Sequence, residues 1–380
     1  MSFLTGIRKV CIPAPAKINL FLSIEGKRDD GFHELQTILA KVQLYDLVEI
    51  ELTDNINGIE ITCPGFSELE NEENLAFKMA NIWLEQTGLK KGIKISIDKN
   101  IPMEAGLGGG SSDAVATLIG LNVLSEVKMT FEEMHSLCTK VGSDCPSFLI
   151  SGICAANGRG EKIREVNPLI RNKVSGKRIL LFKPPCGFST AEIYGMFQKE
   201  DIFFNDRAKI ESRIKDWEAG KLSLSKFIHN DLSGPVYRKY LFIPVLFEEI
   251  IERFSLNPMV SGSGSCCFLL VPEEMDAASG PAARPSGPAV REGTRSSLLY
   301  EELAELNRRG SFGEFVPLAV LEATAKTMAA KIASTTNDAV ANVKSIVDEL
   351  SDDYKVVVRI GKNGSGAPFR RKMDAEAVAA

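Results

Sequence analysis

The stretch Ile101-Pro-Met-Glu-Ala-Gly-Leu-Gly-Gly-Gly-Ser-Ser-Asp-Ala114 holds four glycines and two serines, directly before an apolar run of helical spacing that ends near Leu124. The preceding segment, 92–99, alternates apolar and polar residues as a strand does. Together they predict a strand, a glycine loop and a helix start, for which the serines and the aspartate are suitable residues. Glycines let backbone N–H groups converge, and a helix start adds partial positive charge. We therefore expect an anion here, with phosphate as the first candidate.

The loop differs from the two common nucleotide-binding loops. A P-loop has a lysine directly after its last glycine, whereas serine follows here. A dinucleotide fingerprint requires an acidic residue at the end of the next strand, and no such strand follows in place. A flexible Gly/Ser turn stays an alternative, because such clusters are common in loops. The tight junctions with a strand and a helix favour the anion site.

Composition bounds the class of protein. A length of 380 residues predicts two or three domains, and 44% hydrophobic with 25% charged residues is typical of soluble globular proteins. The net charge of −5 argues against a nucleic-acid partner. The sequence contains no apolar run of about 18 residues, so no membrane span is expected, and its first residues lack the apolar core of a signal peptide. The eight cysteines form no C-x-x-C pair, which indicates reduced thiols in a cytoplasmic protein rather than a zinc site.

Three further segments carry polar residues at defined positions. In the predicted strand 11–24, Lys17 and Asn19 share one face, which could serve a charged substrate or could simply be solvated. His33 lies in a polar loop and could be an ordinary loop residue. Asp144 lies in a turn between a glycine and a proline, where a turn or cap residue needs no further function.

Alternating strands and helices predict a two-domain α+β enzyme, with a change of character near Glu161. Apolar spacing predicts strands within 36–53 and at 177–182, and a second glycine loop leading into a strand within 259–271. It predicts helices at 74–84, 130–141, 206–227 and 244–254, with a further helix start at Ala191.

Three blocks in the same order resemble the GHMP kinase superfamily, which phosphorylates small alcohols. They are Pro15-Ala-Lys-Ile-Asn-Leu20, Pro102-Met-Glu-Ala-Gly-Leu-Gly-Gly-Gly-Ser-Ser112 and Ser261-Gly-Ser-Gly264. Four more resemble the branch that phosphorylates the 2-hydroxyl of a cytidine-linked methylerythritol in the non-mevalonate isoprenoid route. These are Asp30-Gly-Phe-His-Glu-Leu35, Gly142-Ser-Asp-Cys-Pro146, Ser189-Thr-Ala-Glu-Ile-Tyr194 and His229-Asn-Asp-Leu232. The resemblance covers residues 8–275.

The resemblance implies a two-domain GHMP kinase fold with the active site in the cleft between the domains. A ribosomal S5-like N-terminal domain that binds ATP, with a mixed sheet and helices, would span 1–160. A ferredoxin-like C-terminal domain would span 161–275, and an unassigned tail would follow at 276–380.

The resemblance also implies roles for residues. Asp144 would accept the proton of the substrate hydroxyl, and Lys17 would keep that carboxylate ionised and offset charge on the phosphoryl group. Phosphates of ATP would lie over 106–112, with Mg²⁺ bridging them and the Ser112 hydroxyl as a possible ligand. The implied ATP-binding residues are Asn74, Leu75, Lys99, Pro102, Ala105, Gly106, Leu107, Gly108, Gly109, Gly110, Ser111 and Ser112. The implied substrate-binding residues are Asn19, Phe32, His33, Tyr194, Gly262 and Gly264.

Two positions depart from the family pattern. Glu104 stands where a small residue is more common, so its carboxylate must point away from the phosphates. Phe32 replaces a common tyrosine, which keeps base stacking and loses a hydroxyl. The alternatives are another GHMP kinase, for homoserine, mevalonate or a sugar, and a non-catalytic nucleotide-binding paralogue. We expect a small-molecule substrate and a monomer or homodimer.

The tail beyond residue 275 resembles no family. Residues 280–296 have the composition of a linker, 298–306 and 317–350 have helical spacing, and 355–360 could be a strand. One interpretation is a fused partner-binding module. The other, slightly favoured, is that a frame change or gene-model join replaced the natural terminus and that the tail is loosely structured. The hypothesis that the tail is dispensable is tested by truncation after Asp276 and an activity assay, and a large loss of soluble protein or activity would contradict it.

Overall fold

The computed structural model describes residues 9–54, 58–184, 186–199, 205–271 and 356–359. Its described residues up to Gly176, together with those from Asn205 to Asp231 and with Val358 and Arg359, form one compact unit. Those from Lys177 to Lys199, from Leu232 to Val271, and Val356 and Val357 form a second. The boundary expected between residues 160 and 161 stays a prediction, because a compact unit is not by itself an independently folding domain.

A long antiparallel hairpin organises the sheet of the first unit. Its strands are β1 (Lys9–Lys27) and β2 (His33–Thr53). The C-terminal half of β2 pairs with β4 (Gly92–Asp98), and the N-terminal half pairs with β5 (Ile153–Gly158). The sheet is completed by β3 (Ile59–Thr62) beside β4, β6 (Lys162–Glu165) beside β5, and the short β8 (His229–Asn230) beside β1.

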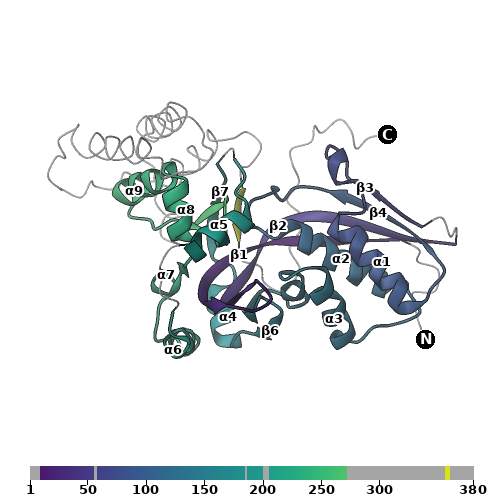
Figure 1. Cartoon of the computed structure of the whole chain (residues 1–380), viewed down its shortest axis with the longest axis horizontal. Coiled ribbons are helices and arrows are strands. Elements are labelled where there is room, and N and C mark those ends of the chain that lie inside the picture. The colour runs from purple at the N-terminus through teal and green to yellow at the C-terminus, as the bar shows by residue number, and fades with distance from the viewer. Residues whose placement is uncertain (1–8, 55–57, 185, 200–204, 272–355, 360–380) are drawn as a thin grey trace. The chain divides into compact units, whose positions relative to one another are not determined.

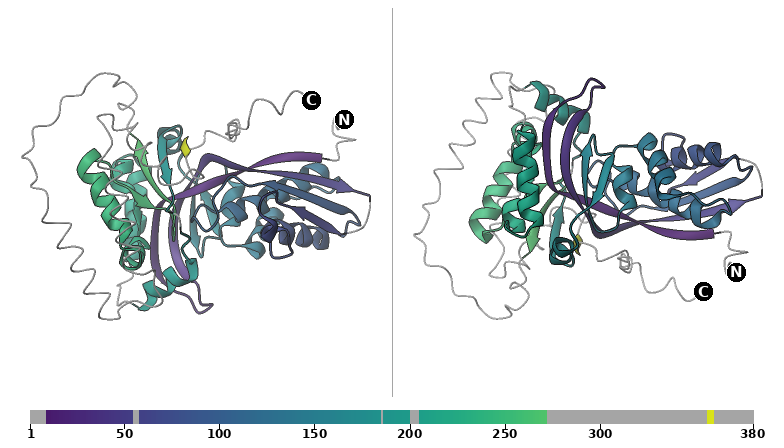
Figure 2. Two further views of the ribbon diagram at one scale, coloured as in Figure 1. Left: turned by 90° about the horizontal axis from the view of Figure 1, so that it is seen from above. Right: turned by 90° about the horizontal axis from the view of Figure 1, so that it is seen from below.

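Three helices of this unit lie on one side of the hairpin, as the helices coloured for residues 75–141 do in both views of Figure 2. They are α1 (Leu75–Thr87), α2 (Gly109–Leu124) and α3 (Phe131–Val141), labelled in Figure 1. The Asn74 side chain caps α1, and a capping box of Thr130 and Glu133 starts α3. The other helices of this unit are η1 (Ser67–Leu69), η2 (Cys145–Leu149), α4 (Pro168–Val174), α6 (Arg207–Glu218) and α7 (Leu224–Phe227).

Helix α2 contributes to a hydrophobic core that it shares with α1 and strands of the sheet. It packs against β1, β2 and α1. Its first three residues are partly or fully exposed, whereas every residue from Ser112 to Leu118 is buried, so that stretch has no polar face. Gly120 permits the close approach to the sheet, because a Cβ there would lie 2.6 Å from Ile50 Cδ1. The glycine loop thus leads into a helix whose position is fixed by close packing against the sheet and α1.

The second unit combines a small sheet with helices. Strand β10 (Cys267–Val271) pairs antiparallel with β7 (Arg178–Phe182) and with β9 (Met259–Val260), and β11 (Val356–Arg359) lies beside β7. Its helices are α5 (Thr190–Lys199), α8 (Ser233–Lys239) and α9 (Phe242–Phe254). In the parts of the chain that the structure describes, no helix combines the length and apolar character needed to cross a membrane.

The α+β architecture and most predicted elements are confirmed, including the strand that becomes β11. The predicted helix 206–227 is wrong in extent, because α6 ends at Glu218, Gly220 takes a left-handed φ of +74° and a separate short helix follows from Leu224. Helix α8 was not predicted, because Gly234 and Pro235 suggest a turn, although proline is tolerated in the first turn of a helix. The predictions for 280–296, 298–306 and 317–350 lie outside the described residues.

Candidate active site

The glycine loop leads directly into α2. Gly106 and Gly108 take left-handed φ values of +69° and +71°, which favour glycine, and Gly108 is the residue before the first helical position. The expectation that serine and aspartate start this helix is therefore wrong, since the helix begins earlier and has no side-chain cap. A glycine start leaves the backbone N–H groups of the first turn facing outward without competing side chains, as an anion site requires.

Lys17 lies against this loop. Its backbone N–H donates to the Leu107 carbonyl at 2.9 Å. A Cβ at Gly108 would lie 3.1 Å from Lys17 Cγ and 3.0 Å from Phe148 Cζ, so only glycine leaves room for both side chains. The solvated-face alternative for Lys17 and Asn19 is wrong, because they are only 4% and 3% exposed.

Hydrogen bonds fix the Lys17 ammonium. Its Nζ donates to Asn19 Oδ1 at 2.7 Å and lies 3.7 Å from Asp144 Oδ2. Asn19 Nδ2 in turn donates to Thr37 Oγ1, and the Thr37 hydroxyl donates to the Phe21 carbonyl. This chain of donors orients the amide oxygen of Asn19 toward the lysine and leaves the ammonium between an amide and a carboxylate.

Asp144 lies directly before η2, and its side chain makes no capping hydrogen bond there. Its side chain is 43% exposed, and among the described residues only Lys17 lies within ion-pair distance of the carboxylate. Gly142 and Gly160 allow the turn that carries Asp144 to pack closely against the neighbouring segments. A Cβ at Gly142 would lie 3.8 Å from Ser111 Oγ, and one at Gly160 would lie 3.0 Å from the Ser143 carbonyl. The carboxylate is thus held beside the lysine and open to a ligand.

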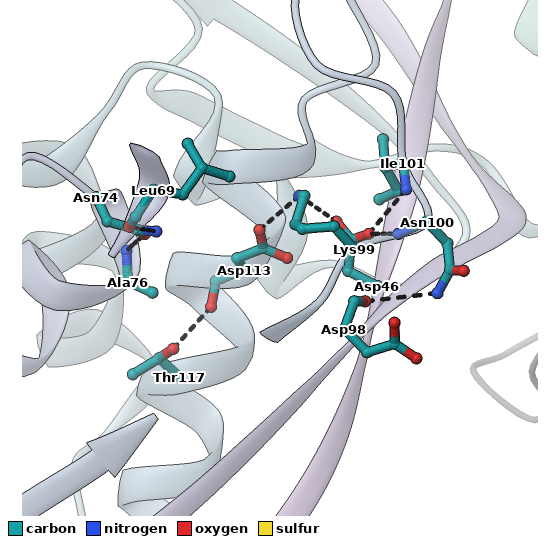
Figure 3. Close-up of polar contacts among 10 residues, drawn as sticks. All are labelled: Asp46, Leu69, Asn74, Ala76, Asp98, Lys99, Asn100, Ile101, Asp113 and Thr117. Carbon is teal, nitrogen blue, oxygen red and sulfur yellow. Dashed lines mark hydrogen bonds and ion pairs between the residues drawn. The ribbon is translucent and has the colours of Figure 1, made fainter. Parts of the chain in front are cut away.

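Beneath the loop, Lys99 bridges two buried aspartates (Figure 3). Its Nζ lies 2.5 Å from Asp46 Oδ2 and 2.8 Å from Asp113 Oδ2. The other oxygen of Asp46 accepts from the backbone N–H groups of Asn100 and Ile101. Strand β2, the start of the loop and the second turn of α2 are joined through this cluster. A Cβ at Gly109 would lie 3.3 Å from Lys99 Nζ, so the ammonium supports the loop from below.

The cluster contains two carboxylates and one ammonium in a buried setting. Burial, and then the Asp46 charge, raises the pKa of Asp113 to about 8 in spite of Lys99. Burial alone would lower the pKa of Lys99, but the Asp113 and Asp46 carboxylates outweigh it and raise that pKa. Both directions fit a cluster that keeps Lys99 charged and holds one extra proton on the carboxylate pair near neutral pH.

The predicted adenine-side residues have defined places. Asn74 Oδ1 accepts from the Ala76 N–H and its Nδ2 donates to the Leu69 carbonyl, so this side chain holds the start of α1. Leu75 Cδ1 lies 3.7 Å from a Cβ position at Gly110, which puts α1 beside the glycine loop. The side chain of Lys99 is only 5% exposed and engaged by carboxylates, so it has no ammonium face open to a nucleotide.

The remaining loop residues fall into two groups. Ala105 and Leu107 are buried and anchor the loop, whereas Pro102 is half-buried. Glu104 is exposed and takes a left-handed φ of +50°. Such a backbone is uncommon for a residue with a Cβ, which makes this position a point of local strain beside the loop.

Two predicted substrate residues start β2. Phe32 is 47% exposed, and the Arg159 guanidinium lies 5.1 Å above its ring centroid. Arg159 also donates to the Thr139 carbonyl, which fixes the guanidinium over the ring. His33 is buried, and burial with a smaller contribution from Lys27 lowers its pKa, so the imidazole is neutral at pH 7.

The other predicted substrate residues belong to the second unit. Tyr194 lies on α5, while Gly262 and Gly264 take left-handed φ values in the turn between β9 and β10. Within that unit the Thr190 and Ser263 hydroxyls lie 2.8 Å apart and join the turn to the start of α5. A Cβ at Gly264 would lie 2.5 Å from the Phe188 ring, so glycine is needed for this packing.

Sequence reasoning missed four residues of this site. Asp46 and Asp113 hold Lys99, Arg159 covers Phe32, and Lys41 is a buried lysine on β2. A charged residue at an inward-facing strand position was a usable signal for Lys41. No local pattern marks Asp46 as the partner of Lys99, because the two are 53 residues apart in sequence.

Residues 74–152 match the family described as GHMP kinases N terminal domain. This range contains the glycine loop and Asp144, whose carboxylate lies 3.7 Å from the Lys17 ammonium. The chain belongs to the GHMP kinases, a family that uses ATP, and the expected α+β fold of this family is confirmed.

Its relatives narrow the family further. The chain is 37% identical to a 4-diphosphocytidyl-2-C-methyl-D-erythritol kinase of Clostridium botulinum, over 68% of this chain and 89% of the relative. It is 36% identical to the enzyme of the same name of Syntrophomonas wolfei, over 71% of this chain and 92% of the relative. A solved structure of 4-(cytidine 5'-diphospho)-2C-methyl-D-erythritol kinase is similar, with a TM-score of 0.56 and 30% identity over 72% of this chain and 91% of that one.

Proposed function

We propose that the chain transfers the γ-phosphoryl group of ATP to the 2-hydroxyl of 4-diphosphocytidyl-2-C-methyl-D-erythritol, a step of the non-mevalonate route to isoprenoids. The observation that carries the proposal is the Lys17 ammonium held beside Gly108, between Asn19 and Asp144. The two relatives, which this chain matches over about nine-tenths of their length, are named as 4-diphosphocytidyl-2-C-methyl-D-erythritol kinases.

Asp144 acts as the proton acceptor. The substrate hydroxyl is a poor nucleophile and must lose its proton during attack on phosphorus. The exposed carboxylate of Asp144 can accept that proton, and the neighbouring Lys17 ammonium stabilises its ionised form. The same ammonium can then offset the negative charge that develops on the transferred group.

The glycine loop binds the phosphates. Backbone N–H groups at the start of α2 donate to the phosphate oxygens, and the bond between Lys17 N–H and Leu107 keeps strand and loop in register. The Asp46–Lys99–Asp113 cluster positions the loop from below, which is the part we propose for Lys99 in ATP binding. Asn74 and Leu75 position α1 beside the loop and border the adenine end.

Mg²⁺ fits this arrangement as an ion held mainly by phosphates. Among the described residues no three His, Cys, Asp or Glu side chains are grouped to hold a metal, whereas Mg²⁺ in kinases needs only one or two protein ligands. The Ser112 hydroxyl, on the first turns of α2, has no hydrogen-bond partner among the described residues and is the ligand we propose. When bound, the ion neutralises phosphate charge during transfer.

The cytidine end would be recognised at the start of β2. An exposed Phe32 ring backed by Arg159 offers one face for base stacking, and a neutral His33 can both donate and accept a hydrogen bond. Tyr194, Gly262 and Gly264 of the second unit stay proposed substrate residues. We further propose a cytoplasmic monomer or homodimer that has no nucleic-acid partner, in keeping with the net charge of −5.

The experiment is coupled ADP release with a panel of alcohols that includes the cytidine-linked methylerythritol, homoserine, mevalonate and galactose. We expect turnover with the cytidine-linked substrate alone. Asp144→Asn is expected to lower kcat by about 10³-fold while ATP affinity stays within a factor of about two. Turnover with another alcohol would reassign the substrate, and an active Asp144→Asn variant would refute the proton acceptor.

A further inference from the structure

Lys41 is a second buried lysine beside Lys17. The two residues are directly opposed in the antiparallel pairing of β1 and β2, and both are 4% exposed. Directly opposed residues project from the same face of a sheet with Cβ atoms about 5 Å apart, and like charges in this relation destabilise the pair. The hairpin therefore carries two buried lysines at opposed positions of one face.

The contacts of Lys41 compensate its charge only in part. Its Nζ donates to the Ser147 carbonyl at 2.5 Å and lies 3.2 Å from Cys154 Sγ and 5.5 Å from the centroid of the Phe148 ring. In the described part of the chain, no carboxylate lies within ion-pair distance of this ammonium. A buried ammonium without a counter-charge disfavours folding, whereas an apolar side chain of the same length would not.

The residues that Lys41 contacts belong to the site. Ser147 and Phe148 lie on η2, which begins directly after Asp144, and the Ser147 hydroxyl donates to the Asp144 carbonyl. The Phe148 ring borders Gly108 of the glycine loop. Lys41 therefore binds the element that carries the proton acceptor on one side and packs against the loop on the other.

We propose that Lys41 is a positioning residue for phosphoryl transfer, which holds η2 with Asp144 in place and forms with Lys17 a cationic pair that favours the γ-phosphate. The proposal rests on the kinase function proposed above. Repulsion between the two ammonium groups is relieved when phosphate oxygens lie over the loop, so the unfavourable charge of the free protein becomes favourable in the ATP complex. Such an arrangement stabilises the γ-phosphate more than the phosphates of ADP.

The experiment compares Lys41→Met and Lys41→Arg with Lys183→Met in the full-length protein. Lys183 is a buried lysine of the second unit that also donates to backbone carbonyls, so its replacement controls for loss of a buried ammonium in general. For each variant we measure kcat by ADP release, the dissociation constants of ATP and ADP by calorimetry, and the urea midpoint.

We expect Lys41→Met to keep or raise the urea midpoint, to lower kcat about tenfold and to reduce the preference for ATP over ADP by a similar factor. Lys41→Arg, which keeps the charge, should retain most of the kcat and most of the preference for ATP over ADP. Lys183→Met should change neither kcat nor that preference. Wild-type kcat and ATP preference in Lys41→Met would overturn the proposal. So would failure of that variant to fold, because the lysine would then be a structural residue.

The ATP-to-ADP affinity ratio does not depend on which alcohol accepts the phosphoryl group. If the cytidine-linked substrate is not turned over but the ratio falls in Lys41→Met, the proposed substrate is wrong and the inference about Lys41 holds. If the substrate is turned over and the ratio is unchanged, only the inference about Lys41 fails.

Discussion

Replacing Asp113 by asparagine tests the charge state of the buried Asp46–Lys99–Asp113 cluster. Asp113 is 3% exposed, and its pKa is raised to about 8 by burial and by the Asp46 charge. An aspartate in an unfolded chain has a pKa of about 3.9. A carboxyl whose pKa is higher in the folded state binds its proton more tightly there, so it stabilises the fold at low pH and this contribution is lost as pH rises through about 8.

The magnitude follows from linkage. Between pH 9 and pH 7 the protonated fraction of folded Asp113 rises from about a tenth to about nine-tenths, while the unfolded residue stays ionised. The free energy of unfolding should therefore increase by on the order of 1 kcal/mol over this interval from Asp113 alone. Asparagine cannot titrate, so the variant lacks this increment.

Urea unfolding of both proteins at pH 7, 8 and 9 provides the assay, and the difference between the proteins at each pH removes the contribution of all other groups. We expect that difference to shift by on the order of 1 kcal/mol in favour of wild type as the pH falls from 9 to 7. A difference that is constant over this range would refute the reasoning, because Asp113 would then be ionised in the folded protein at pH 7.

Two further substitutions probe the loop and the edge of the sheet. Gly108→Ala should lower the free energy of unfolding by about 1–2 kcal/mol because of its left-handed φ, and should raise KM for ATP about tenfold because the new methyl group contacts Lys17 and Phe148. Gly88→Ala is the control, since Gly88 has a φ of +66° and open space at Cβ, and it should lose stability only. Equal KM values for the two variants would contradict this prediction. Asp231→Asn should cost about 2–3 kcal/mol at pH 7, because Asp231 accepts from Ser23, Asn205 and the Ile24 N–H. Hydrogen bonds from His229 and these donors lower the pKa of Asp231 against the effect of burial, so its contribution is present above pH 4 and is lost progressively on acidification. A deficit in urea stability that does not shrink as the pH falls below 4 would argue against it.

Much of the first unit could be predicted from local patterns. Alternation gave β4, apolar spacing gave α1 and α3, and the glycine cluster marked the loop before α2. The burial of Lys17 and Asn19 could not be predicted from alternation, because both faces of β1 are covered at that point. A pattern of period two distinguishes the faces of a strand but does not tell which of them meets water when both meet protein.

Long-range partners set the other limit. The resemblance predicts that Lys99 contacts the nucleotide, whereas its ion pairs with Asp46 and Asp113 depend on the packing of β2 against α2. Asp144 was placed in a turn correctly, but its distance of 3.7 Å from Lys17 depends on the packing of η2 against the hairpin. The roles of these residues were approachable from sequence, whereas their distances and burial were not.

The backbone bond between Lys17 and Leu107 has a consequence for how the protein becomes active during synthesis. The two residues leave the ribosome far apart in time, and the strand that carries Lys17 emerges first. Neither a nascent chain that stops before α2 nor an isolated hairpin contains the complete site that we propose for the phosphates. Activity in a refolding experiment should consequently return in the same kinetic phase that buries α2 against β1, with no earlier partially active species.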